Sequence, residues 1–62
     1  MCELTIYSLK GERREKIMEG VVVLTPQNGN VLIENIFGES KVVEGELGEI
    51  NITAQKADII VP

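Results

Sequence analysis

Cys2 carries the only thiol in this sequence of 62 residues, and thiolates are strong ligands for soft metal ions. Because the cysteine is single, an internal disulfide is not expected, and because the chain has no histidine, an ordinary zinc site is not expected either. A lone cysteine inside a chain is most often a small buried apolar residue. Near a chain end, however, its thiolate and a backbone or amine nitrogen can chelate a metal ion and fill half of a four-coordinate shell.

A complete shell at Cys2 needs a second copy of the chain. Two copies supply two sulfurs and two nitrogens, a donor set that in a plane suits Ni(II) or Cu(II), whereas sulfur-rich tetrahedral shells suit zinc. The nitrogen is the α-amine of Cys2 if Met1 is removed, and the backbone nitrogen of Cys2 or Glu3 if Met1 is retained. Because the ligand is a thiolate, binding is expected to weaken as the pH falls. The residues alone leave this chelate and a buried thiol both open.

A basic cluster is the second candidate site, and it consists of Lys10, Arg13, Arg14 and Lys16. With Tyr7 nearby, these side chains are candidates for contacts with the phosphates and one base of an RNA strand. The net charge of −4 opposes this interpretation, and Glu12 and Glu15 interrupt the cluster. A solvated hairpin is therefore favoured, and an RNA-binding small barrel is kept as the alternative function.

Catalysis is not expected from this sequence. No histidine is present, and no base lies close to Cys2 in the sequence to activate its thiol. The many glutamates alternate with apolar residues, as they do on the solvated face of a strand. An acid–base pair also needs a cleft that separates two pKa values, which a chain of this length can scarcely enclose.

Short apolar stretches separated by glycine or asparagine predict strands joined by tight turns. The expected strands cover residues 2–7, 14–18, 21–25, 31–36, 40–44, 49–54 and 59–61, with turns at 10–12, 19–20, 28–29, 37–39 and 55–57. In the strand at 49–54, Ile50, Ile52 and Ala54 are expected to share a face. The fold class is therefore all-β, a small closed antiparallel barrel of six to seven short strands, SH3-like or Sm-like, in one domain over residues 1–62.

The length of the chain favours a homodimer. A core formed by 62 residues is marginal by itself, and burial of more surface against a second copy is the remedy that remains without a disulfide or zinc site. The longest unbroken apolar run covers residues 21–24, far short of a membrane span, and the N-terminus does not resemble a signal peptide. One unpaired thiol suits the reducing cytoplasm.

The sequence resembles the CooT family, small proteins linked to nickel insertion into carbon monoxide dehydrogenase. The resemblance covers nearly the whole chain and rests on short motifs in a fixed order. These are the Met1-Cys2 start, the strand at 21–25 before an Asn-Gly turn, Ile36-Phe37-Gly38-Glu39, Val43-Glu44-Gly45 and Glu49-Ile50-Asn51-Ile52.

The resemblance implies a homodimeric Sm-like or SH3-like barrel that binds Ni(II) at its subunit interface. Cys2 of both subunits is then the metal ligand, and no other metal ligand carries over from the family. The implied role is delivery or storage of nickel, without turnover of a substrate, for the maturation of a nickel enzyme such as carbon monoxide dehydrogenase. Small barrels of this shape also include RNA-binding proteins, which is an analogy of fold and not of site.

Overall fold

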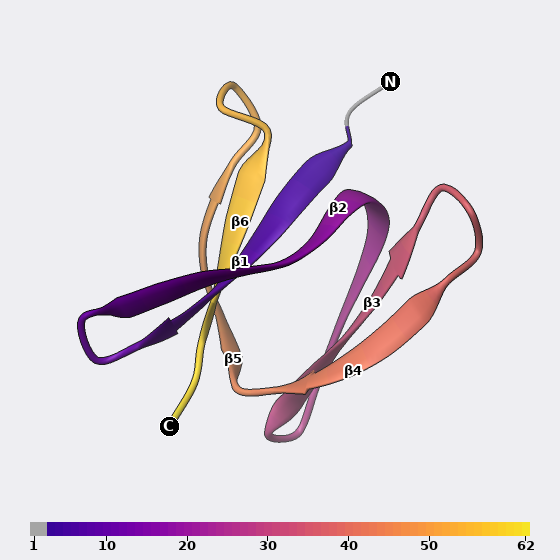
Figure 1. The fold of residues 1–62 in the computed structure, drawn as a ribbon. Helices are drawn as coiled ribbons and strands as arrows, with labels where there is room; N and C mark the ends of the chain where they lie inside the picture. The colour runs from indigo at the N-terminus through magenta and orange to yellow at the C-terminus, as the bar shows by residue number, and fades with distance from the viewer. Residues whose placement is uncertain (1–2) are drawn as a thin grey trace.

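The computed structural model describes residues 3–62, which form six strands and no helix (Figure 1). The strands are β1 (Leu4–Lys10), β2 (Arg13–Gln27), β3 (Asn30–Asn35), β4 (Ser40–Glu44), β5 (Glu46–Asn51) and β6 (Lys56–Ile60). They form one sheet in the order β4-β3-β2-β1-β6-β5. The predicted all-β class with six strands is confirmed. Since the described residues contain no helix, they contain none that could cross a membrane.

The sheet differs from the expected closed antiparallel barrel in two respects. β1 and β6 are parallel, whereas the other four neighbouring pairs are antiparallel. β4 and β5 are the two edge strands and are not hydrogen-bonded neighbours within residues 3–62. The physical reason is the connection between them. Gly45 alone joins β4 to β5, and one residue is too short for a hairpin turn, so the two strands follow one another instead of pairing.

β2 is a single bent strand of 15 residues that continues through the break expected at Glu19-Gly20. Gly20 has a φ of 66°, and the register of β2 shifts near this residue against both of its neighbours. Gly20 therefore forms a bulge, which bends a strand without ending it. The bend lets the first half of β2 pair with β1 and the second half with β3.

The core lies on the inner face of the curled sheet and is formed by Leu4, Ile6, Val21, Val31, Ile33, Ala57 and Ile59. β3 alternates between buried and less buried residues along its whole length, and β1 does so from Leu4 to Tyr7, as expected for strands with one face on a core. The strand expected at 21–25 contains the longest apolar run of the sequence, residues 21–24, but its side chains are not equally buried. In the single chain Val21 is buried, but Val22 and Val23 are each more than two-fifths exposed.

The end of the chain turns earlier than expected. β5 ends at Asn51, whose Oδ1 accepts the N–H of Ala54 at 2.9 Å, and the turn occupies residues 52–55. This local acceptor provides the backbone with an alternative to strand pairing. The prediction of a strand through Ala54 and a turn at 55–57 is therefore wrong. Ile50, Ile52 and Ala54 do not share a strand face, because Ile52 and Ala54 lie in the turn.

Candidate functional site

Cys2, the predicted metal ligand, lies outside the described residues. Glu3, whose backbone nitrogen is a candidate co-ligand, is the first described residue. Within residues 3–62, no group of three or more histidine, cysteine, aspartate or glutamate side chains is arranged to hold a metal ion. The surroundings of Glu3 are thus the part of the predicted metal site that the structure describes.

A polar depression of about 400 Å³ lies at the start of β1, and we call it the N-terminal depression. It is lined by Glu3, Thr5, Glu19, Gly20, Ala54 and Gln55. The start of β1, the bend in β2 and the turn before β6 meet here, and all three lie at the top of Figure 1. The N–H of Thr5 donates to the carbonyl oxygen of Gln55 at 2.9 Å, which joins the turn to β1.

Two carboxylates border the N-terminal depression, and the structure gives one of them a partner. Lys16 Nζ lies 2.6 Å from Glu19 Oε2. This hydrogen bond, with the attraction between the two charges, raises the pKa of Lys16 and lowers the pKa of Glu19. Both groups therefore remain charged at neutral pH, while Glu3 forms no ion pair among the described residues.

Exposed apolar side chains lie beside the same depression. The N–H of Ile36 donates to the carbonyl oxygen of Gly20 at 2.9 Å, so the turn after β3 contacts the bend in β2. Ile36 is 45% exposed and Phe37 is 79% exposed. Buried Asn35 fixes this turn, because its Oδ1 accepts the N–H groups of Phe37 and Glu39 at 3.0 Å each. We call Ile36 and Phe37 the apolar rim. The sequence signal for this exposed position is an apolar residue, Phe37, directly before the turn glycine Gly38.

The predicted basic cluster is divided between the two faces of the β1–β2 hairpin. Arg13 and Arg14 are adjacent in β2, and adjacent residues of a strand point to opposite faces. Arg14 Nη2 lies 3.3 Å from Asp58 Oδ1, and its Cζ lies 4.4 Å from the centre of the Tyr7 ring. Lys16 pairs with Glu19. The ring that could stack a base is thus covered by Arg14, and this arrangement does not favour the RNA alternative.

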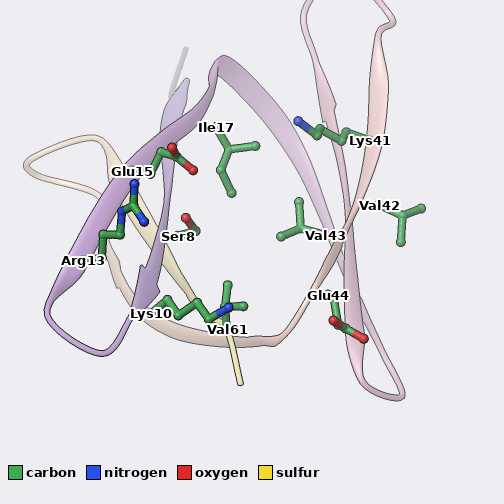
Figure 2. A pocket seen from close by; sticks show the side chains of 10 residues that line it. All are labelled: Ser8, Lys10, Arg13, Glu15, Ile17, Lys41, Val42, Val43, Glu44 and Val61. Carbon is green, nitrogen blue, oxygen red and sulfur yellow. The ribbon is translucent and has the colours of Figure 1, made fainter.

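Lys10 and Arg13, the other two members of the cluster, line a groove of about 460 Å³ (Figure 2). This hairpin groove, as we name it, lies between the β1–β2 hairpin and β4. Ile17 from β2 and Val43 from β4 face one another across it, and Lys41 extends from the β4 side. Lys41 was not among the predicted site residues, because nothing local in the sequence connects it to the hairpin.

A family model described as CO dehydrogenase accessory protein CooT matches residues 1–60, a range that includes Cys2. Among solved structures, the chain is similar to one described as a CooT from Carboxydothermus hydrogenoformans. The two share 26% sequence identity and a TM-score of 0.88, and the match covers 98% of each chain. No curated protein matches the chain significantly.

Proposed function

This chain belongs to the CooT family of CO dehydrogenase accessory proteins, and from that premise we propose that it holds Ni(II) between the Cys2 residues of a homodimer. An accessory role toward carbon monoxide dehydrogenase follows from the family. The observation that carries the proposal is that the family match includes Cys2, the single thiol of the chain. Nickel is here the cargo, which the protein delivers or stores without turning over a substrate.

The donor set supports nickel at a shared site. Each chain offers one thiolate and one backbone nitrogen, from Cys2 or Glu3, and has no histidine to complete a shell. Two chains related by a twofold axis offer two sulfurs and two nitrogens, which suits a planar Ni(II) site. A reducing cytoplasm, which we propose as the location, keeps both thiols free for the metal.

The apolar rim supports a dimer contact near the N-terminus. Ile36 lies against the bend at Gly20, and a side chain added at Gly20 would lie 3.6 Å from Ile36 and 3.7 Å from the Glu3 carboxylate. Glu3 directly follows Cys2 in the sequence. A twofold contact that covers Ile36 and Phe37 of both chains would therefore lie next to the residues that follow Cys2, and burial of these side chains would stabilise it.

Titration of the purified protein with Ni(II) tests this function. We expect one Ni(II) per two chains, with absorbance in the thiolate-to-nickel charge-transfer region that disappears in Cys2→Ser. Glu3→Gln is the matched control, because it removes a carboxylate but keeps the backbone nitrogen, and it should retain the absorbance. A stoichiometry of one nickel per chain, or absorbance that survives in Cys2→Ser, would contradict the shared site.

A further inference from the structure

β4 leaves one edge of the sheet open. One edge of β4 pairs with β3, and no strand of residues 3–62 pairs with the opposite edge of β4. The N–H of Asn35 donates to Glu39 O at 2.9 Å, and the N–H of Gly45 donates to Gly29 O at 3.0 Å. Because bonded pairs alternate in an antiparallel ladder, the odd-numbered residues of β4 bond to β3. The N–H and C=O groups of Val42 therefore point toward the open edge, as do those of the other even-numbered residues.

An open strand edge is a template for one more strand, and proteins often protect it with charged residues. In β4 these charges are Lys41 and Glu44, on either side of Val42 and Val43. Val42 is 59% exposed. The hairpin groove lies along this strand, so a segment added to the edge would contact the groove as well. A strand added at this edge would thus meet both the free backbone groups of β4 and the side chains of the hairpin groove.

The groove carries positive charge that no ion pair within residues 3–62 neutralises. Lys10 and Arg13 are cross-strand partners, and like charges in this position repel each other. Lys41 adds a third cation from β4. Among the described residues the ion pairs are those of Arg14 and Lys16, on the other face of the hairpin. Three cations that have no ion-pair partner in the described part of the chain, beside an apolar surface, favour an anionic ligand that also carries apolar groups.

Glu15 and Glu44 also border the groove and restrict the kind of anion. A uniform polyanion such as a nucleic acid would meet both carboxylates, whereas a peptide can space its charges to avoid them. A small anion would leave the edge of β4 unpaired. A peptide strand satisfies the backbone edge and the side-chain surface together, as in other complexes that extend a sheet.

We propose that the hairpin groove binds an extended acidic segment of a partner protein, which adds as a strand to the open edge of β4. Its carboxylates lie at Lys10, Arg13 and Lys41, and its apolar side chains cover Ile17 and Val43. The groove is at the Lys10 end of β1, and Glu3 precedes the other end, roughly 20 Å away at the usual rise of a strand. This docking site is therefore independent of the proposed nickel site.

Synthetic peptides and amide NMR spectra of the full chain test the proposal. The probes are eight-residue peptides in which two glutamates alternate with two residues chosen from valine, isoleucine and threonine, so that each face of the extended strand carries both kinds of side chain. The comparison peptides have lysine in place of glutamate. We expect the acidic peptides to shift the amide signals of β4 and of the hairpin, with an affinity that decreases as salt is added. Absence of shifts with every acidic peptide, or equal binding of the lysine peptides, overturns the proposal.

Charge reversal locates the anionic contacts. The variant Lys10→Glu/Lys41→Glu should weaken binding by about tenfold or more, because two attractions become repulsions. The control Lys16→Glu/Lys56→Glu changes the net charge equally at residues outside the groove and should bind nearly as the natural chain does. Equal affinities of the two double variants overturn the proposal.

Val42→Pro tests strand addition itself. Proline removes the Val42 N–H at the open edge but leaves the bonds between β4 and β3 in place, and proline is tolerated at such edges. We expect Val42→Pro to lose peptide binding and Val42→Ala to keep most of it, with dispersed spectra showing that both fold. Unchanged binding in Val42→Pro overturns the proposal. So does dissociation of the homodimer in Val42→Pro, or a short single-stranded RNA that displaces the acidic peptide.

Discussion

The two ends of β1 present opposite kinds of surface. The N-terminal depression is bordered by carboxylates and lies beside the apolar rim of Ile36 and Phe37. The hairpin groove is bordered by three cations that form no ion pair among the residues described, over Ile17 and Val43. The first end suits a cation and a second copy of the chain, whereas the second suits an anionic partner. One short strand thus separates the two proposed binding sites within a chain of 62 residues.

The two ends also depend on distant parts of the sequence to different degrees. At the N-terminal end, the proposed metal ligand is one residue whose chemistry is independent of the fold. At the groove, Lys41 faces Lys10 and Arg13 only because the sheet curls and brings β4 opposite the hairpin. The first function should therefore respond to one substitution, and the second to changes in the curl of the sheet.

The largest expected effect is that a substitution at one end of β1 removes binding at that end and leaves binding at the other end unchanged. Cys2→Ser should abolish nickel binding, because the chain has no other thiol, and should leave acidic-peptide binding at the groove unchanged. The variant Lys10→Glu/Lys41→Glu should show the reverse, with charge-transfer absorbance retained and peptide binding weakened by about tenfold or more. Nickel titration and peptide titration of both variants measure the separation. Loss of both activities in either variant would show that the ends are coupled.

A large loss of stability is expected when the bend at Gly45 is changed. A Cβ at this position would lie 2.5 Å from the carbonyl oxygen of Ile60, and the φ of 143° disfavours any other residue. Gly45→Ala should lower the free energy of unfolding by about 3 kcal/mol or more, measured by urea denaturation. That is a large share of the stability expected for so short a chain.

The bend at Gly20, near the other end, is the matched control for Gly45. A Cβ at Gly20 would make only ordinary contacts, at 3.6 Å with Ile36 and 3.7 Å with Glu3, although its φ is 66°. Gly20→Ala should therefore cost about 1–2 kcal/mol, the strain of the left-handed conformation alone. Equal losses at the two glycines would show that the contact with Ile60 does not restrict β4 and β5.

Local signals in the sequence predicted much of the fold. The Asn28-Gly29 turn is present, with Gly29 at a φ of 79°, and the strand predicted at 40–44 matches β4. Nonlocal features were missed. The parallel pairing of β1 with β6 depends on how the sheet curls, and no short stretch of sequence encodes it. The turn after Asn51 was missed because its side chain, and not a glycine, ends the strand.

The candidate sites show the same difference between local features, which the sequence predicts, and nonlocal features, which it does not. Cys2 could be selected from the sequence because it is the single thiol, and its role as a nickel ligand stays a prediction. The division of the basic cluster could also have been predicted, since Arg13 and Arg14 are adjacent in a strand and must face opposite sides. Lys41 could not, because about 30 residues separate it in sequence from the hairpin that it faces.

A smaller effect is expected at the apolar rim. Phe37→Asp should weaken the proposed homodimer by about tenfold or more, because each twofold contact would lose two buried rings. The fold of each chain should remain intact, since Phe37 is 79% exposed in the single chain. Val42→Asp is the control, because Val42 is also exposed and apolar but belongs to the groove end. Analytical ultracentrifugation over a range of concentrations measures the dimer dissociation constants of both variants. Equal weakening by Phe37→Asp and Val42→Asp would place the dimer contact elsewhere.

The smallest effect is expected from the ion pair between Lys16 and Glu19. Pairing lowers the pKa of Glu19 below its ordinary value of 4.5, so its contribution to stability is present above that pH and is lost as the pH falls through the folded-state pKa. The raised pKa of Lys16 acts in the opposite direction, and its contribution is lost only as the pH rises above 10.5. Both groups are solvent-exposed, so the pair should contribute little between these limits. Urea denaturation of Glu19→Gln should match the natural chain closely at pH 7 and at pH 3. A large loss of unfolding free energy at pH 7 would contradict this expectation. It would show that Glu19 also positions the residues around the N-terminal depression.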